Sequence, residues 1–300
     1  MFVLAGMRGS VKAAVAGRAL KFITRISIAG IALGATAGPS LSGVKSTIVV
    51  DAYSGRVIRA YNADASHPPA SLAKMMTLYL TFEALKSGKL RWNQRVRISR
   101  HAATRMPSKI YLRHGQRVRI RDLVYATAVK SANDAAAALA EAIAGSEFRF
   151  AQLMTRRAHQ IGMKSTYFGT ASGLPARGQR TTARDMARLG RALILHHGKY
   201  YHIFSTRYFR YGRRTFASTN RLLHRRRGVD GIKTGYTNRA RFNLVTSARR
   251  GRKRVVTVVL GATSSRTRYN RTRWLIAQGL KGRPKTRQFA AIHRPGAAVV

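Results

Sequence analysis

The sequence predicts an α+β fold, an α/β sandwich in which helices flank one antiparallel sheet and a helical insertion interrupts it. Two short extended runs, residues 45–51 and 56–61, predict a β-hairpin near the N-terminus. Two further β-rich runs, residues 243–247 and 254–260, predict a second hairpin near the C-terminus. Between the hairpins, residues 98–197 have mostly helical spacing. Strands at both ends with helices between them indicate one sheet built from N- and C-terminal segments.

The helices of the insertion are predicted from apolar spacing and from residues that cap helix ends. Ser71 opens a run whose apolar residues recur at helical intervals. Ser146 is expected as the N-cap of an amphipathic segment, and Thr182 begins a sequence that resembles a capping box. Further predicted helices cover residues 122–129, 134–144, 147–161, 182–195 and 271–280.

The two ends of the chain differ in composition from the predicted folded domain. Residues 1–37 combine a basic segment, an apolar run and a final Ala-Thr-Ala, which is typical of an export signal. The folded domain is expected at residues 38–281, and the basic residues 282–300 are expected to form a disordered tail. An exported protein would be periplasmic, and nucleic acid is then not an expected partner.

The charge balance of the chain is extreme. Its 57 lysines and arginines face only 9 aspartates and glutamates, which gives a net charge of +48. Most cations therefore lack an internal carboxylate partner and must lie on the surface, where they favour a polyanionic neighbour such as an acidic polymer or a lipid headgroup layer. The chain has no cysteine, which excludes disulfides, thiolate catalysis and cysteine-ligated zinc.

Three short motifs follow one another along the chain. They are Ser71-Leu72-Ala73-Lys74, Ser131-Ala132-Asn133 and Lys233-Thr234-Gly235. Each motif alone has a plainer interpretation, because Ser71 and Ser131 could cap helices and the third motif could be a turn into a strand. Together they describe acyl transfer. A serine in the first turn of a helix presents its Oγ, and a lysine three residues later lies on the same helical face.

In this chemistry Ser71 is the expected nucleophile and Lys74 the base that takes its proton. Lys74 acts as a base only when neutral, and partial burial together with the nearby Lys233 would lower its pKa. Ser131 would relay a proton towards the leaving amine. The backbone N–H groups of Ser71 and Tyr236 would form the oxyanion hole, which is worth several kcal/mol of transition-state stabilisation.

The other residues of the motifs are expected to bind substrate. Asn133 offers an amide to the substrate backbone, while Lys233 and Thr234 offer a charge and a hydroxyl to a substrate carboxylate. Gly235 lets the substrate approach the strand edge closely. No zinc-binding or nucleotide-binding motif occurs, so neither a metal nor a cofactor is expected.

This set of motifs resembles the penicillin-binding proteins and the class A β-lactamases. Over about residues 45–280 the flanks are similar to the low-molecular-weight D-alanyl-D-alanine carboxypeptidases. The similar segments are residues 69–74, 181–186, 218–220, 229–235 and 242–245. The resemblance implies a β-lactamase/transpeptidase-like fold and a serine acyl-enzyme that removes the terminal D-alanine from peptidoglycan stem pentapeptides. It also implies covalent inhibition by β-lactam antibiotics.

The resemblance further implies an arginine beyond the third motif that binds the substrate carboxylate, and Arg268 matches it by position. The sequence at residues 261–265 departs from the family pattern, and Tyr236 stands where family members often have histidine. A class A β-lactamase also needs a carboxylate base for its deacylating water. No E-x-x-L-N motif supplies one, so efficient β-lactam hydrolysis is not expected.

The leading hypothesis from the sequence is a periplasmic D-Ala-D-Ala carboxypeptidase. One alternative is a D,D-endopeptidase that acts on cross-linked peptidoglycan with the same residues. The other is a protein of this fold that works through its basic surface on an anionic membrane or wall polymer.

Overall fold

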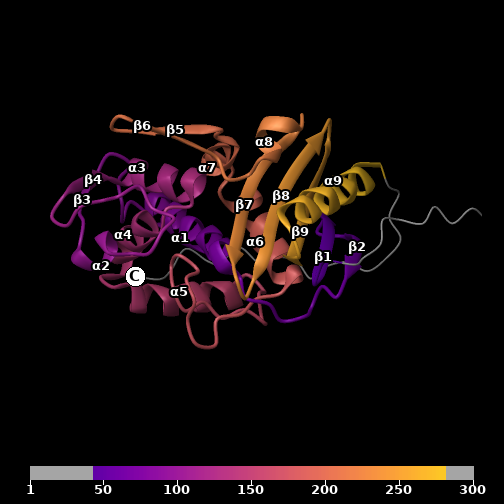
Figure 1. The fold of residues 1–300 in the computed structure, drawn as a ribbon, viewed down its shortest axis with the longest axis horizontal. Coiled ribbons are helices and arrows are strands. Elements are labelled where there is room, and N and C mark those ends of the chain that lie inside the picture. Colours follow the sequence, from indigo (N-terminus) through magenta and orange to yellow (C-terminus); the bar gives the residue numbers. More distant parts are fainter. Residues whose placement is uncertain (1–42, 282–300) are drawn as a thin grey trace, which may run out of the picture. The chain divides into compact units, whose positions relative to one another are not determined.

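The computed structural model describes residues 43–281, which form a β-sheet with helices on both faces and an adjoining helical region (Figure 1). The expected export signal at residues 1–37 and the expected tail at residues 282–300 lie outside the described residues. Both therefore stay predictions. Within residues 43–281 no helix is long and apolar enough to cross a bilayer.

One five-stranded antiparallel sheet, in the order β2-β1-β9-β8-β7, joins strands from distant parts of the chain. Its strands are β1 (Ser46–Asp51), β2 (Val57–Tyr61), β7 (Val229–Thr237), β8 (Arg241–Arg250) and β9 (Lys253–Ala262). The N-terminal strand β1 lies between β2 and β9, with Ile48 opposite Val258. Both predicted hairpins and the predicted sheet are confirmed, and β7 is left as an edge strand.

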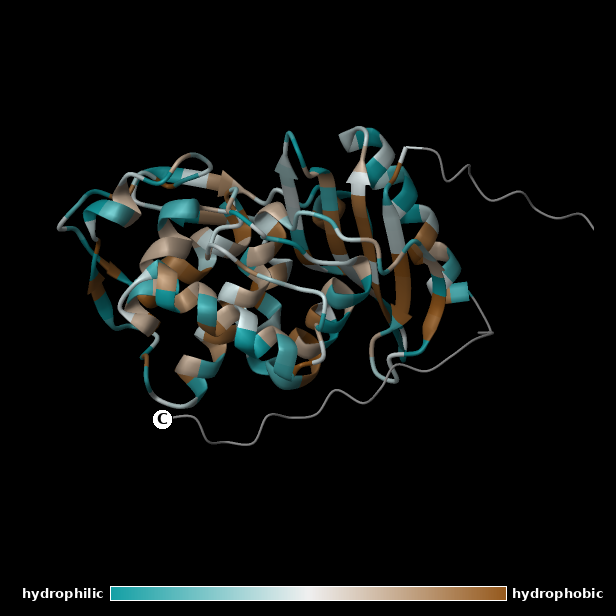
Figure 2. Cartoon of the chain, turned by 90° about the horizontal axis from the view of Figure 1, so that it is seen from below, coloured by the Kyte–Doolittle hydropathy of each residue, from teal (hydrophilic) through white to brown (hydrophobic). Residues whose placement is uncertain are grey.

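Side chains of the sheet alternate between two hydrophobic layers, because successive residues of a strand point to opposite faces. Val256 of β9 packs into the core shared with α6 (Ala183–His196), whereas its neighbour Val255 packs against α9 (Ser265–Lys281). Figure 1 shows α9 lying across one face of the sheet while α6 lies behind it. The strands and the inner helices carry most of the hydrophobic residues (Figure 2).

The helical region packs around α1 (Lys74–Lys86), which is buried along most of its length. The alanine-rich helix α4 (Asn133–Ala144) lies against α1, and its small side chains allow the close approach. The remaining helices of this region are α2 (Arg100–Ala103), α3 (Ile120–Tyr125) and α5 (Glu147–Gln160). Three more short helices lie later in the chain: α7 (Gly198–Tyr201), η3 (His202–Ser205) and α8 (Leu222–Arg225).

Two predicted N-caps are confirmed. The Ser146 hydroxyl accepts a hydrogen bond from the Arg149 N–H at 3.2 Å, and the Thr182 hydroxyl accepts one from the Asp185 N–H at 3.1 Å. The expected capping box is incomplete, because the Asp185 carboxylate accepts from Ser165 N and Thr166 Oγ1 instead.

Two other elements differ from the prediction. Helix α9 begins at Ser265, six residues before the predicted start at 271. Two small antiparallel ribbons were also not predicted, and one strand of the first lies in the stretch expected to be helical. They pair β3 (Arg95–Arg97) with β4 (Arg117–Arg119), and β5 (Tyr208–Tyr211) with β6 (Arg214–Ala217).

Candidate active site

Ser71 lies in the short helix η1 (Ala70–Ala73), which leads directly into α1. The interpretation of Ser71 as a helix cap is wrong, because the N-cap residues of η1 and α1 are Pro69 and Ala73. No side chain caps either helix. The Ser71 hydroxyl is therefore not committed to holding a helix end.

Lys74 is fully buried at the start of α1, and its Nζ lies among three oxygen atoms. These are Ser71 Oγ at 3.1 Å, Asn133 Oδ1 at 2.6 Å and the Ser172 carbonyl at 2.6 Å. Burial lowers the pKa of Lys74 well below its usual value, and the positive charge of Lys233 lowers it further. Both causes that the sequence suggested are present. A neutral Lys74 can accept the Ser71 proton across this 3.1 Å contact.

The second motif begins with Ser131, which ends the short π-helix η2 (Ala126–Lys130) in a left-handed conformation with φ +64°. A non-glycine residue there carries local strain, a feature that concentrates at functional sites. Ser131 does not cap α4, because Ala132 occupies that N-cap position. Within the described residues no hydrogen bond joins the Ser131 side chain to Ser71 or Lys74.

Asn133 links the second motif to the first. Its Oδ1 accepts from Lys74, and its Nδ2 donates to the Met106 carbonyl at 2.7 Å. Its backbone N–H donates to the Ser108 carbonyl at 2.6 Å, so three hydrogen bonds hold this residue beside Lys74. The amide that was expected to bind substrate is thus also a structural partner of Lys74.

The third motif lies on the edge strand β7, next to η1. A Cβ added to Gly235 would stand 3.3 Å from the Ser71 N and 3.1 Å from the Pro69 carbonyl oxygen. The strand passes so close to Ser71 that any side chain at Gly235 would press against the η1 backbone. Thr234 Oγ1 donates to Thr219 Oγ1 at 2.8 Å, an interaction that the sequence did not suggest.

Lys233 and Arg268 form the positive end of the site, and both are buried. Burial, with a smaller effect from Arg268, lowers the pKa of Lys233 to about 7. The Arg268 guanidinium donates to the Asn243 carbonyl at 3.4 Å and to Ser265 Oγ at 3.2 Å, and its buried Nε has no hydrogen-bond partner among the described residues. Arg268 therefore lies near Lys233, and its contact with a substrate carboxylate stays a prediction.

Tyr236 follows Gly235, so its backbone N–H belongs to the strand segment that approaches Ser71. This placement is compatible with the oxyanion hole that the sequence predicted from the two N–H groups. The Tyr236 ring is half-exposed and packs against Phe242 at a centroid distance of 4.5 Å.

Sequence reasoning missed the segment that carries the Ser172 carbonyl, since a backbone acceptor leaves no side-chain signal. Its position depends on Gly173, which has φ +77° and where a Cβ would lie 1.8 Å from the Ala70 carbonyl oxygen. It also depends on Glu147, whose Oε1 accepts from the Ala171 N–H at 3.0 Å. Position 173 therefore requires glycine, because any side chain there would clash with the Ala70 carbonyl of η1.

The two carboxylates that act on the charge of Lys74 are already engaged. Asp134 accepts hydrogen bonds from the backbone N–H groups of Ile110 and Leu112, and Glu147 also pairs with His101 and Arg105. Neither carboxylate is free to position a hydrolytic water. Between residues 43 and 281 no three histidines or acids gather in a way that could hold a metal ion.

The sequence profile of the D-alanyl-D-alanine carboxypeptidases, peptidase family S11, matches residues 35–264. The chain belongs to this family. A D-alanyl-D-alanine carboxypeptidase of Escherichia coli, DacC, is 39% identical over 244 residues, which are 79% of this chain and 61% of the relative. DacF of Bacillus subtilis is 37% identical over 75% of this chain and 59% of its own length. The chain thus spans about three fifths of the length of these curated relatives.

Solved structures of penicillin-binding proteins share the fold of this family member. Penicillin-binding protein 5 of Haemophilus influenzae matches with a TM-score of 0.78 and 35% identity, over 81% of this chain and 72% of that one. Penicillin-binding protein D2 of Listeria monocytogenes, in its ampicillin-bound form, matches with a TM-score of 0.74 and 32% identity, over 81% of this chain and 100% of that one. The predicted penicillin-binding fold is confirmed.

Proposed function

We propose that this chain is a serine-type D-Ala-D-Ala carboxypeptidase that removes the terminal D-alanine of peptidoglycan stem pentapeptides. The observation that carries the proposal is the Ser71–Lys74 pair, in which a buried lysine with a lowered pKa lies 3.1 Å from the serine oxygen. Membership of the D-alanyl-D-alanine carboxypeptidase family supports the choice of substrate.

In the acylation step, Ser71 Oγ attacks the carbonyl carbon between the two D-alanines while Lys74 Nζ takes the hydroxyl proton. The N–H groups of Ser71 and Tyr236 stabilise the negative charge that develops on the carbonyl oxygen. Lys74 then gives up this proton, which Ser131 and Lys233 help to deliver to the leaving nitrogen, and Lys74 is neutral again. The peptide C–N bond breaks, an ester forms on Ser71, and D-alanine departs.

The substrate carboxylate is held at the positive end of the site. Lys233 and Arg268 supply charge there, Thr234 supplies a hydroxyl, and Asn133 offers its amide to the substrate backbone. The ester is hydrolysed by a water molecule, which gives its proton to Lys74 and its hydroxyl to the acyl carbon. Ser71 recovers its proton, and the stem tetrapeptide leaves.

With a β-lactam the same attack opens the lactam ring, and the leaving nitrogen stays tethered to the acyl group. Asp134 and Glu147, the carboxylates that act on Lys74, are occupied by backbone and cationic partners. A long-lived adduct rather than turnover is therefore expected, because neither carboxylate is free to prepare a hydrolytic water and the tethered nitrogen stays in the site, where it hinders the water that Lys74 would activate.

Labelled penicillin tests the proposal. The folded protein should form a covalent adduct on Ser71, and Ser71→Ala should abolish it. Ser87→Ala, at the exposed C-terminal end of α1, is the matched control and should label like the wild type. A folded wild-type protein that takes no label would refute the acyl-enzyme.

A D,D-endopeptidase is the second candidate. A D-alanyl-D-alanine endopeptidase of Pseudomonas aeruginosa is 30% identical over 236 residues, 73% of its own length. Release of D-alanine from a stem pentapeptide, measured beside cleavage of a cross-linked dimer, separates the two activities. Faster cleavage of the dimer would assign the endopeptidase.

The location of the protein follows from the same proposal. Peptidoglycan substrates require export to the periplasm, which the pattern at residues 1–37 supports. The net charge of +48 would hold the protein at an anionic membrane or wall polymer. Release from isolated envelopes by high salt is expected, because ions screen exposed charges.

A further inference from the structure

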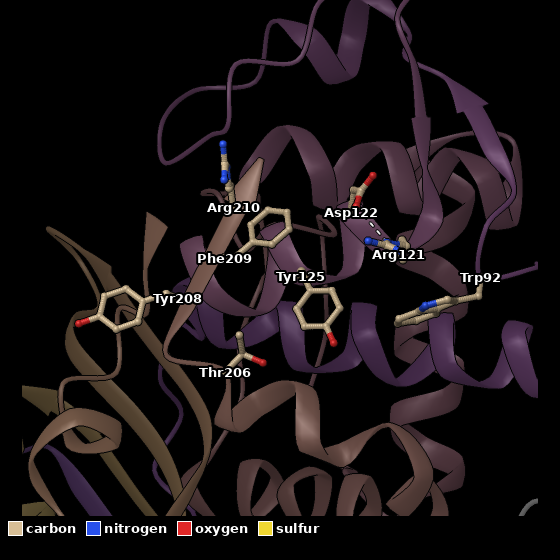
Figure 3. A pocket seen from close by; sticks show the side chains of 8 residues that line it. All are labelled: Trp92, Arg121, Asp122, Tyr125, Thr206, Tyr208, Phe209 and Arg210. Atoms are coloured by element: carbon tan, nitrogen blue, oxygen red, sulfur yellow. Dashed lines mark ion pairs between the residues drawn. The ribbon is translucent and has the colours of Figure 1, made fainter. Parts of the chain in front are cut away.

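A pocket of about 370 Å³ lies between helix α3 and strand β5, and no residue of the three motifs lines it (Figure 3). Half of the lining residues are aromatic, and the others are polar. The aromatic ones are Trp92, Tyr125, Tyr208 and Phe209, and the polar ones are Arg121, Arg210, Thr206 and Asp122, which is paired with Arg121. The volume falls within the range of small-molecule sites, about 300–1,000 Å³.

The aromatic rings form two walls of different orientation. The rings of Tyr125 and Phe209 are stacked, with centroids 5.8 Å apart and an interplanar angle of 12°. The Trp92 indole stands at 70° to the Tyr125 ring, 6.2 Å away. Aromatic faces are negative, and the C–H groups of a sugar ring carry partial positive charge, so such faces suit a saccharide.

Beside this pocket, β3 and β4 present four arginines in directly opposed pairs, Arg95 with Arg119 and Arg97 with Arg117. The intervening valines alternate to the other face and pack towards the core. We call these four arginines the arginine ribbon. Like charges directly opposite each other destabilise a sheet, so the ribbon costs stability in the free protein.

The pocket and the arginine ribbon are joined through the backbone. The Arg121 N–H donates to the Trp92 carbonyl at 3.0 Å, and the Ile120 N–H donates to the Gln94 carbonyl at 2.9 Å. Trp92 lies three residues before Arg95. The flanks of β3 and β4 are therefore held together at the pocket wall, which places the pocket and the arginine ribbon next to each other in the fold.

Among the described residues, Asp122 is the one carboxylate that forms ion pairs with this surface. All nine acids of the chain lie within residues 43–281, and each accepts hydrogen bonds or ion pairs inside the fold. Among the ion pairs of these residues, only those of Asp122, with Arg119 and Arg121, reach the ribbon or the pocket. The other three ribbon arginines are left for an external anion.

We propose that the aromatic pocket and the arginine ribbon together bind an acidic glycan, whose sugar rings stack on Trp92, Tyr125 and Tyr208. Its carboxylates pair with the forked guanidinium groups, which match carboxylate geometry. Charge alone would not require the aromatic walls, and a lipid surface would not require a pocket. The proposed glycan site does not involve Ser71, so its test does not depend on whether the protein is a peptidase.

Intrinsic fluorescence provides the test, because Trp92 and Trp274 are the two tryptophans of the chain. In the full-length Trp274→Phe variant, galacturonate oligomers should change the emission of Trp92 in a saturable way. Neutral dextran should not change it, and inorganic polyphosphate of equal charge should bind at least about tenfold more weakly, since it lacks sugar rings.

Variants locate the binding. One double variant, Arg97→Gln with Arg117→Gln, removes two ribbon charges and should weaken galacturonate binding about tenfold. The control, Arg250→Gln with Arg252→Gln, removes two charges at the β8–β9 turn and should change the affinity less than about twofold. Both pairs are exposed, and thermal unfolding verifies the fold. Tyr208→Ala should weaken galacturonate but not polyphosphate. The exposed Tyr53→Ala is its control.

Three results would overturn the proposal. Equal losses in the two arginine double variants would mean that general charge binds the glycan. An unchanged affinity in Tyr208→Ala would remove the stacking role of that ring. Tighter binding of polyphosphate, of a single-stranded oligonucleotide or of anionic phospholipid vesicles than of galacturonate would assign the surface to another class of partner.

Discussion

Cations serve opposite purposes in the catalytic site and in the arginine ribbon. Lys74, Lys233 and Arg268 have at most 7% of their surface exposed, and burial lowers the pKa of each. Arg95, Arg97 and the rest of the ribbon lie at the surface, and three of its four members are exposed. Both groups consist of cationic side chains of one very basic chain.

The difference lies in the medium around each charge. A cation withdrawn from water loses solvation, so a buried lysine releases its proton more easily and becomes a base. A solvated arginine keeps its full charge, and only salt or a bound anion reduces its repulsion from its neighbours. The net charge of +48 for the whole chain therefore does not tell how either group of cations behaves. Burial thus allows a lysine such as Lys74 to become a base, whereas an exposed arginine stays charged and can bind an anion.

The largest expected effect comes from Lys74→Arg, which keeps the charge but removes the neutral state. Arginine is not deprotonated in proteins, so Ser71 loses its base. We expect penicillin acylation to slow by about 10²–10⁴-fold, the usual contribution of general base catalysis. Stopped-flow acylation measures the rate. Lys86→Arg, at the exposed end of α1, should react like the wild type, and a Lys74→Arg rate within tenfold of it would contradict the role.

Gly173→Ala tests how tightly the backbone encloses the buried lysine. The new Cβ would lie 1.8 Å from the Ala70 carbonyl oxygen, at a positive φ of +77°. We expect a loss of roughly 3 kcal/mol or more in the free energy of unfolding, with slower acylation, since Ala70 precedes the nucleophile.

Gly88→Ala is the control for backbone strain, with φ +79° and no atom within 4 Å of its Cβ. It should lose only about 1 kcal/mol. Urea unfolding measures both variants. Equal losses would show that the contact with Ala70 is relieved at no cost.

Lys233→Met tests the energetic consequence of burying a cation. The pKa of Lys233 is about 7 in the folded protein and 10.5 for an ordinary lysine, so between these values the unfolded chain binds one more proton. The free energy of unfolding of the wild type therefore rises with pH from about 7 to 10.5. Below pH 7 Lys233 is protonated in both states, and the cost of burying its charge is present in full. Methionine removes the titration, so its stability gain over the wild type should be largest at pH 6 and shrink towards pH 10.

Urea midpoints at pH 6, 8 and 10 give this difference directly. The exposed Lys86→Met should show no comparable trend relative to the wild type. A Lys233→Met difference that does not change with pH would mean that Lys233 titrates near its ordinary value.

The smallest expected effect belongs to the ribbon. Arg95→Glu places an opposite charge across from Arg119 and should stabilise the protein by about 0.2–1 kcal/mol at low salt. The gain should vanish at 1 M salt, where the screening length is about 3 Å. Arg177→Glu, on an exposed loop, changes the net charge equally and is the control. A gain that persists at high salt would point to packing instead of charge.

Much of the fold could be predicted from the sequence. The strands β1 and β9 have long apolar runs, and the caps Ser146 and Thr182 precede amphipathic helices, so local signals and final structure agree. The strands β3 and β4 were missed because three residues of the pattern Arg-Val-Arg are too short to establish a period.

The site was predictable where its chemistry resides in side chains. Lys74 and Lys233 could be named from their motifs, whereas the Ser172 carbonyl and the engagement of Glu147 could not. A backbone acceptor is the same in every residue, and its direction depends on a loop conformation that only the tertiary structure fixes. The left-handed conformation of Ser131 likewise depends on the tertiary structure, so the sequence could not predict it.

The position of β1 inside the sheet has a consequence for how the protein is made. The first strand of the described residues, β1, pairs with β9, about two hundred residues later, and Gly235 must reach η1 before Ser71 has its neighbours. Pairings between segments so distant in sequence form slowly. An unfinished chain that still lacks β7 and β9 therefore has no assembled site, and Ser71 gains its neighbours only when these strands have joined the fold.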